Sequence, residues 1–273
     1  MQIIDACREV RKLVVETIDP EYVRIDPFQT GAYISCGSVT SDIVLSAKLN
    51  SRIQGLDEPV AISTPRMLTG IFDGPDYQNG EISASYAVNG HDRKFQFSNG
   101  RGSVTTMKVL GGSTLNEFAK MVKPLPSPGQ LVMPVTALWK GQFEYWSKHA
   151  HQHEDKCKAS FVSKEGALSC VVGDYNFDHH IWLCEAGEDA GFVSAISFRC
   201  SSMMEVLQVF PHVRRMSISV STDALMLIRA ESDNAQYSFY IPGEVPHWYK
   251  TARLRVDAID DPRSVTQQRQ DES

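Results

Sequence analysis

The chain contains an internal repeat, and this repeat limits the possible folds more than any single motif. The segments PVAISTPRMLTGIF at 59–72 and VSAISFRCSSMMEVLQVF at 193–210 each place a short apolar strand ending in Ala-Ile-Ser before a helix-sized segment. The two triplets lie 134 residues apart, as do an Ile-Ser pair at 82 and a Met-Ser pair at 216. The repeat predicts a duplicated structural unit.

The order of predicted elements is the same in both halves. A helical pattern of apolar residues at Ile3, Cys7, Val10 and Val14 recurs 136 residues later at Trp139, Phe143, Trp146 and Ala150. Alternating segments then predict hairpins and strands in each half. These segments are YVRIDPFQTGAYISC, DIVLSAKL, ISASYAV and KFQFS in the first half, and KCKASFV, ALSCVV, MSISVST, ALMLIRA and QYSFYIP in the second. The pattern predicts an α+β fold with two similar domains, each an antiparallel sheet plus two helices.

The segment KPLPSPG near the middle of the chain marks the boundary between the halves. Three prolines within five residues exclude a helix interior or a central strand, which indicates an extended connector. We therefore expect a first domain at 1–122, a connector at 123–129 and a second domain at 130–249. Residues 250–273 turn polar and lack aromatic residues, so we expect a tail.

Composition indicates a folded protein in a reducing compartment. The 273 residues are 42% apolar and 22% charged, with a formal net charge of −6. No apolar run is long enough to span a membrane, and the acidic residues near the N-terminus are unlike a targeting peptide. The six cysteines are scattered without a C-x-x-C pair, which favours reduced and mostly buried thiols. We expect a cytoplasmic protein.

The element order and two segments resemble the ring-shaped sliding clamps of DNA replication, especially tailed-phage processivity clamps and proliferating-cell nuclear antigen. ALMLIRAESDNAQYSFYIPGE at 224–244 is similar to the closing hairpin of these clamps, and KPLPSPG is similar to their interdomain loop. The resemblance covers residues 1 to about 245. It implies a six-domain ring formed by a head-to-tail homotrimer, with sheets outside and helices facing the central hole.

This resemblance also implies the function and the partners. Such a ring would encircle double-stranded DNA without sequence preference and tether the replicative DNA polymerase as a non-enzymatic processivity factor without a cofactor. A separate ATP-driven clamp loader would open the ring, because the chain has no nucleotide-binding loop. If the protein is viral, its location would be the host cell cytoplasm.

Cationic residues on the predicted helices are the candidates for contact with DNA. They are Arg8, Arg11, Lys12, Lys140 and Lys148 on the longer helices, with Arg66 and Arg199 near the starts of the shorter ones. Weak phosphate contacts of this kind would hold DNA while allowing the ring to slide. The alternative is an ordinary solvated helix surface, since acidic residues such as Glu9 and Glu144 share these helices.

A second candidate site would bind the C-terminal peptide of the polymerase. By position, the resemblance implies an apolar pocket between the connector and the C-terminal segment. Its residues would be Met121, Val122 and Leu125 on one side and Tyr240, Ile241 and Pro242 on the other. The alternative is that the connector residues only pack against their own domain.

The histidine-rich segment KHAHQHEDKC, residues 148–157, is the densest group of potential metal ligands. Histidines spaced by two residues converge poorly on a helix, and no second ligand pair accompanies them, so we predict a solvated helix end and no metal. The glycine-rich runs NGRGS and LGGST lack the ending of a phosphate-binding loop and predict turns. Two alternatives to the clamp remain: a duplicated structural or assembly protein of a virion without DNA function, and a metal enzyme using these histidines.

Overall fold

The structure is a computed structural model that describes residues 1–37, 43–78, 81–111, 131–149, 157–164, 167–173, 178–185, 196–221 and 224–244. Its elements follow the predicted order twice. The first half contains α1 (Ile3–Val10), the π-helix η1 (Arg11–Val15), α2 (Glu16–Ile18), β1 (Val23–Phe28), β2 (Gly31–Gly37), β3 (Val44–Leu49), β4 (Val60–Ile62), α3 (Arg66–Asp73), β5 (Ser83–Asn89), β6 (Asp92–Ser98) and β7 (Val104–Val109).

The second half repeats this order after one additional strand. It contains β8 (Leu131–Pro134), α5 (Ala137–His149), β9 (Lys158–Lys164), β10 (Ala167–Gly173), β11 (Asp178–Glu185), β12 (Ser197–Arg199), α6 (Cys200–Leu207), the 3₁₀-helix η3 (Phe210–His212), β13 (Arg215–Ser221), β14 (Leu225–Glu231) and β15 (Ala235–Pro242). The predicted α+β class with a repeated helix, hairpin, strand-helix and hairpin order is confirmed. The π-helical turn within the first helix was not predicted by its 3.6-residue period.

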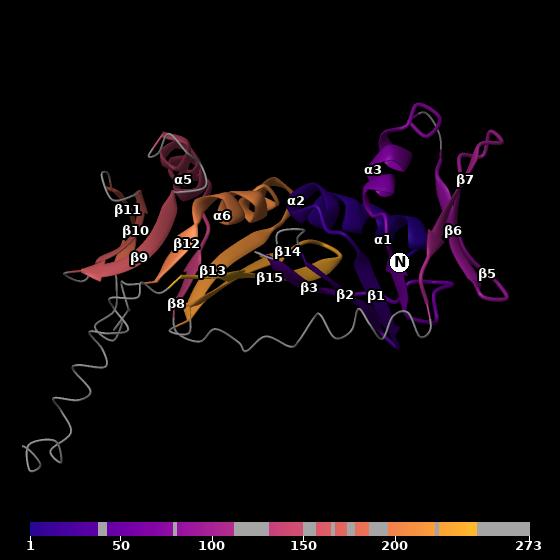
Figure 1. Ribbon diagram of the computed structural model, residues 1–273, viewed down its shortest axis with the longest axis horizontal. Helices are drawn as coiled ribbons and strands as arrows, with labels where there is room; N and C mark the ends of the chain where they lie inside the picture. The colour runs from indigo at the N-terminus through magenta and orange to yellow at the C-terminus, as the bar shows by residue number, and fades with distance from the viewer. Residues whose placement is uncertain are drawn as a thin grey trace, which may run out of the picture.

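An eight-stranded sheet joins the two halves. Its strand order is β4-β1-β2-β3-β15-β14-β13-β8, so β3 of the first half pairs antiparallel with β15 of the second. The smaller sheets β11-β10-β9-β12 and β5-β6-β7 lie at opposite ends of the elongated molecule (Figure 1). The helices α1, α2 and α6 lie above the eight-stranded sheet in the view of Figure 1, and α3 and α5 lie beside the inner faces of the two end sheets.

Hairpin positions define how the two halves correspond. Phe28 pairs with Gly31 where β1 turns into β2, and Lys164 pairs with Ala167 where β9 turns into β10. Each residue of the second pair lies 136 positions after its counterpart. Buried Ile3 and Cys7 correspond at this offset to buried Trp139 and Phe143, as the helix pattern predicted, whereas Trp146 is only partly buried and Ala150 lies outside the described residues.

The Ala-Ile-Ser triplets do not occupy corresponding positions in the two halves. Ala61 pairs with Arg24 on β1, and its counterpart paired with the corresponding residue of β9 is Ser197, not Ala195. Burial explains this offset of 136: Val60 and Ile62 are buried in the first half, as Ile196 and Phe198 are in the second. The duplication was predicted correctly, but the matching letters that indicated it are displaced by two residues.

The described cysteines agree with the prediction of reduced, buried thiols. Cys7, Cys36, Cys157, Cys170 and Cys200 are buried and form no disulfide. Burial raises the pKa of Cys7 to about 12, which keeps the thiol protonated at neutral pH and chemically inert. In the part of the chain that the structure describes, no helix has the length and hydropathy needed to cross a membrane.

Candidate nucleic-acid interface

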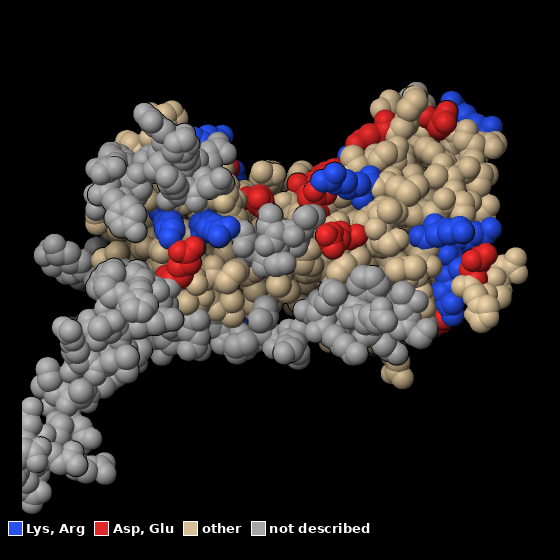
Figure 2. Space-filling model, viewed as in Figure 1, with Lys and Arg blue, Asp and Glu red and all other residues tan. Residues whose placement is uncertain are grey.

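The helix-bearing side is the candidate surface for DNA, and it is hollowed between the two ends of the molecule (Figure 2). Both halves of the chain contribute predicted cations to this side. Arg8 and Lys12 are exposed on the first helix, and Lys148 is exposed near the end of α5. On the face shown in Figure 2, blue and red side chains are mixed and form no continuous positive patch.

Arg11 is held by acidic neighbours. Its guanidinium donates to both carboxylate oxygens of Asp73 on α3, at 2.8 and 2.9 Å, and lies 2.9 Å from Glu16. It also lies over the ring of Phe72, 6.0 Å from the centroid, and its side chain is only 21% exposed. These contacts connect the first helix to α3, so the Arg11 guanidinium stabilises the packing of the two helices.

Arg8 shares the Phe72 ring but remains more accessible than Arg11. Its guanidinium lies 5.8 Å from the ring centroid, while the nearest carboxylate contact is with Asp5 at 3.7 Å. The side chain is 48% exposed. Because an ion pair at this distance and exposure is weak, Arg8 can still contact a phosphate.

Three other predicted cations are also paired with carboxylates. Arg66 donates to both oxygens of Asp19, and this hydrogen bonding lowers the pKa of the Asp19 carboxyl below its ordinary value. Lys140 pairs with Glu144 one turn later on α5 and is largely buried. Arg199 lies 3.9 Å from Glu244, which also binds Lys158.

Lys12 and Lys148 differ from the rest of the set. Both are exposed, and neither forms an ion pair with a residue that the structure describes. They lie 136 positions apart, the same offset as the β1–β2 and β9–β10 hairpins, so they occupy corresponding sites on the two long helices. These two lysines are the strongest candidates for phosphate contact.

The described helices as a set carry no excess of positive charge. Within their described bounds they contain six lysines and arginines and six acidic residues. The cations are Arg8, Arg11, Lys12, Arg66, Lys140 and Lys148, and the acids are Asp5, Glu9, Glu16, Asp73, Glu144 and Glu205. Any attraction to DNA therefore depends on which charges are left unpaired, not on the sum.

The candidate peptide site is described only in part. Met121, Val122 and Leu125 lie outside the described residues. Tyr240 pairs in register with Leu227 on one side and Val44 on the other, which places an apolar row across the junction of the two halves. Pro242 is exposed at the end of β15. Ile241 is only 1% exposed and belongs to the core.

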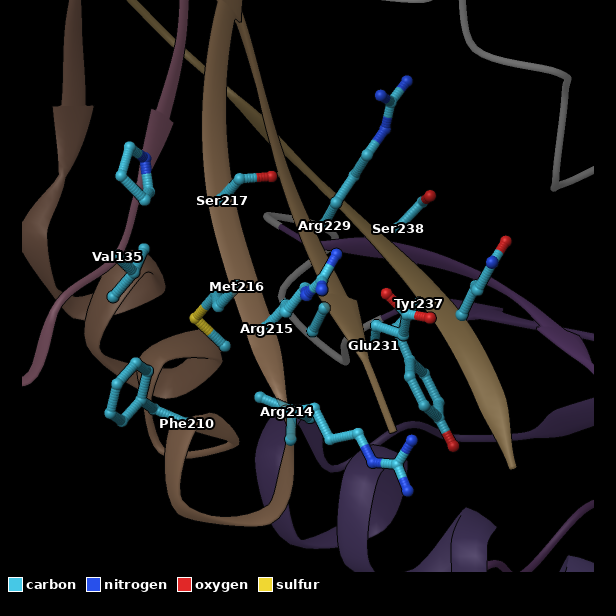
Figure 3. A pocket seen from close by; sticks show the side chains of 14 residues that line it. Val135, Phe210, Arg214, Arg215, Met216, Ser217, Arg229, Glu231, Tyr237 and Ser238 are labelled. Carbon is cyan, nitrogen blue, oxygen red and sulfur yellow. The ribbon is translucent and has the colours of Figure 1, made fainter. Parts of the chain in front are cut away.

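A cavity of about 780 Å³ lies beside β13, β14 and β15 (Figure 3). Its lining includes Arg214, Arg215 and Arg229, the carboxylate of Glu231, and apolar side chains such as Phe210. Arg214 is paired with Asp233, and Arg215 lies opposite Glu231 in the strand register. None of the predicted site residues lines this cavity.

The histidine-rich segment is described only at its two ends. His149 ends α5 as predicted, and its ring stacks on Tyr145 with centroids 4.2 Å apart. Cys157 is buried, with its sulfur 3.3 Å from that of Cys200. His151, His153 and Asp155 lie outside the described residues. Within the described ranges, no three potential ligands are placed to hold a metal ion.

Sequence reasoning missed most of the acidic partners of the predicted cations. Asp73 and Asp19 come from segments distant from Arg11 and Arg66 in the chain, at separations of 62 and 47 residues. No local pattern signals such pairs. The Lys140–Glu144 pair could have been predicted, because residues four apart on a helix are neighbours.

Comparison with known proteins identifies the fold. No protein-family model matches the sequence, and no curated protein matches it. Among solved structures, proliferating cellular nuclear antigen from Entamoeba histolytica has a TM-score of 0.60 at 13% identity, over 88% of this chain and 95% of that chain. The counterpart from Thermococcus kodakaraensis has a TM-score of 0.60 at 11% identity, over 87% and 97%. A chain of the PCNA2–PCNA3 complex from Sulfolobus tokodaii has a TM-score of 0.56 at 9% identity, over 88% and 95%. The chain has the sliding-clamp fold.

Proposed function

We propose that this protein is a DNA sliding clamp, a non-enzymatic processivity factor that encircles duplex DNA as a homotrimeric ring. The main support for this proposal is the way in which the two halves are joined. They form one sheet through β3 and β15, while β11 and β7 are the outermost described strands of the two end sheets. A chain with two such ends can bind copies of itself head to tail, and closure after three chains would give six domains.

The helix-bearing side would then line the central hole. Three copies would present Lys12 and Lys148 from alternating domains, with Arg8 as an additional contact. Few phosphate contacts suffice, because a closed ring holds DNA by topology and a weak, sequence-independent attraction lets it slide. The nearly balanced charge of the helices is compatible with weak contact of this kind.

The partners belong to the same proposal. We propose that the C-terminal peptide of a DNA polymerase binds the apolar row at Tyr240 and Pro242, together with Met121 and Val122 at the end of the first domain and Leu125 of the connector. Ile241 would support the strand from the core. A separate ATP-driven clamp loader would open the ring. A viral origin and the host cell cytoplasm as location rest on the resemblance to tailed-phage clamps.

Oligomeric mass and retention on DNA test the proposal together. Light scattering at several concentrations is expected to give three times the chain mass of 30.5 kDa. After loading onto nicked circular DNA, the protein is expected to stay bound through a high-salt wash and to be released when the circle is linearised. A chain that stays monomeric at every concentration would contradict the proposal.

One observation favours the alternative of a duplicated virion structural or assembly protein without DNA function. The described helices carry equal numbers of cations and acids, so they have no net positive charge. This alternative predicts stable oligomers that are not retained on circular DNA and show no difference before and after linearisation. The retention assay therefore separates the two functions even if both form rings.

A further inference from the structure

We propose that the outer face of the eight-stranded sheet, the face turned away from α1, α2 and α6, binds carboxylates of a partner peptide beside the apolar row at Tyr240. Arg229 is the central residue of this acidic-peptide site. The inference rests on the proposed function, because it starts from the peptide site at Tyr240 and Pro242. It adds the chemistry of the peptide, which is an apolar anchor with acidic residues next to it.

A continuous row of side chains crosses the outer face from β2 to β8. Residues directly opposite each other on paired strands point to the same face of a sheet, so the strand registers identify the members of this row. They are Ser35, Ser46, Ser238, Arg229, Ser217 and Pro134. Arg229 is therefore flanked by Ser238 and Ser217, whose hydroxyl groups can donate hydrogen bonds to the same anion as the guanidinium.

The cavity of about 780 Å³ lies over this part of the outer face. Two consecutive rows across β13, β14 and β15 supply most of its polar lining: Ser217, Arg229 and Ser238 in one row, and Arg215, Glu231 and Gln236 in the next. The lining residues between these rows, Met216, Ala230 and Tyr237, are buried on the helix side, so their backbone forms the floor. In Figure 3, the side chains of Arg229 and Ser238 extend from their strands in the same direction.

The outer face carries an excess of positive charge, unlike the described helices. Within the bounds of the eight strands, its charged residues are the cations Arg24, Lys48, Arg215 and Arg229 and the acids Asp26 and Glu231. Four cations and two acids give this face a net charge of +2, although the whole chain carries −6. Arg24 is paired with Asp26 at 2.7 Å, whereas Arg229 is exposed and forms no ion pair with a residue that the structure describes. The charge of this face is complementary to that of an acidic ligand.

The apolar row of the proposed peptide site is the next row on the same face. It crosses the internal seam, which is the pairing of β3 with β15 that joins the two halves, and it contains Tyr240 and Leu227. Tyr240 lies two residues beyond Ser238 on β15, and Leu227 lies two residues before Arg229 on β14. Residues two apart in an extended chain are separated by about 7 Å. In an extended peptide lying along these strands, an acidic residue two positions from the apolar anchor therefore reaches Arg229.

The combination of the two rows favours a peptide over a nucleic acid. The guanidinium of Arg229 can donate two parallel hydrogen bonds to one carboxylate. The adjacent apolar row offers no hydrogen bond to the next phosphate of a nucleic-acid backbone, but it can contact an apolar side chain. A peptide that carries both groups contacts both rows, whereas a duplex contacts only the cationic row.

Peptide binding to the full chain tests the site. The probes are three short fluorescein-labelled peptides with the same Leu-Phe anchor and, two positions from it on either side, Asp, Asn or Lys. Fluorescence anisotropy is expected to show that the wild type binds the Asp peptide about three- to fivefold more tightly than the Asn peptide, as for a solvent-exposed ion pair. Arg229→Gln is expected to remove this difference and to leave the affinity for the Asn peptide unchanged.

Three further variants separate a direct contact from a general loss of charge or of folding. Arg229→Lys keeps the charge and is expected to retain part of the preference for the Asp peptide. Arg101→Gln is the matched control, because it removes the same charge from the exposed turn between β6 and β7, and it is expected to retain the full preference. Arg229→Glu is expected to bind the Lys peptide more tightly than the Asp peptide, a reversal that unfolding cannot produce.

The outcomes distinguish this inference from the proposed function. Equal affinities of the wild type for the Asp and Asn peptides would overturn the acidic-peptide site while leaving an apolar peptide site. If none of the three peptides bound, both peptide proposals would be overturned, and the ring would still be tested by oligomeric mass. If Arg229→Gln weakened binding to duplex DNA or changed the oligomeric mass without affecting the peptides, the face would belong to DNA or to a second copy, and the inference would be wrong.

Discussion

The helices at the starts of the two halves bury the same face and expose different chemistry. Ile3 and Cys7 on α1 correspond to Trp139 and Phe143 on α5, and all four are buried. On the exposed side, Glu9 of α1 binds the β14–β15 turn, whereas the corresponding Tyr145 of α5 is open to solvent. The two halves share the buried face of this helix, and they differ in the exposed residue that contacts the sheet junction in the first half.

Removing a buried side chain from one of these helices is expected to lower the free energy of unfolding more than any other change. Phe143→Ala leaves a cavity under α5 at a fully buried position and is expected to cost about 3–5 kcal/mol of unfolding free energy. The corresponding Cys7→Ala removes one sulfur atom and is expected to cost much less. Urea unfolding followed by circular dichroism measures both. Equal losses would show that the two helices do not pack in corresponding ways.

The Glu9 network is expected to have the next largest effect, because it stabilises only the internal seam. Glu9→Ala leaves the buried hydroxyl of Tyr237 without this acceptor and is expected to cost about 1–3 kcal/mol. Tyr145→Ala is expected to change the unfolding free energy of the monomer by less than about 0.5 kcal/mol, since the ring is exposed.

The control for the Glu9 effect is the double variant Glu9→Ala/Tyr237→Phe. Removing both partners is expected to recover part of the loss, because no buried hydroxyl remains unsatisfied. Purely additive losses in this cycle would contradict a direct interaction between the two side chains.

Alkaline pH is expected to destabilise the second half more than the first. Burial, followed by the Glu9 charge, raises the pKa of Tyr237 well above its ordinary value, while burial and the hydrogen bond to Glu58 raise the pKa of Tyr86 to about 12. Because the unfolded chain loses these protons near pH 10, the stability that these two tyrosines contribute is constant below about pH 10 and falls above it.

The fall is at most about 1.4 kcal/mol per pH unit for each tyrosine. Unfolding free energies at about pH 8 and pH 11 measure it, and Tyr237→Phe is expected to reduce the fall more than Tyr86→Phe because Tyr237 is more deeply buried. A larger reduction by Tyr86→Phe than by Tyr237→Phe would mean that folding raises the pKa of Tyr86 more than that of Tyr237.

The two unpaired lysines are expected to affect stability least while changing DNA binding. Lys12→Ala and Lys148→Ala are each expected to alter unfolding free energy by less than about 0.5 kcal/mol. If the proposed site is correct, each variant is expected to lose about one phosphate contact per bound chain and to lower the salt dependence of binding by about one such contact. Fluorescence anisotropy on duplex DNA at several salt concentrations measures this.

Lys48→Ala is the matched control for the lysine variants. It removes the same charge from the sheet side of the molecule, where β3 turns an exposed residue away from the helices. The control is expected to leave the salt dependence unchanged. An equal effect from Lys48→Ala would contradict a helix-facing DNA site.

Local sequence predicted most elements because periodicity directly records which face of a segment is buried. The glycine-rich run NGRGS was expected to form a turn, and it connects β6 to β7. Gly100 and Gly102 adopt positive φ there, a conformation that glycine reaches without steric cost. The ion pairs of Arg11 and Arg66 were not predictable, since their partners come from distant segments.

The amino-acid sequence by itself determined the duplication, the order of helices and strands, and the buried face of each, because these depend on residues close together in the chain. Only the tertiary structure decided that β3 pairs with β15, that the repeat corresponds at Ser197 and not Ala195, and that Arg11 and Arg66 pair with Asp73 and Asp19. Strand edges have the same backbone groups everywhere, so the partner of an edge depends on what folding brings beside it.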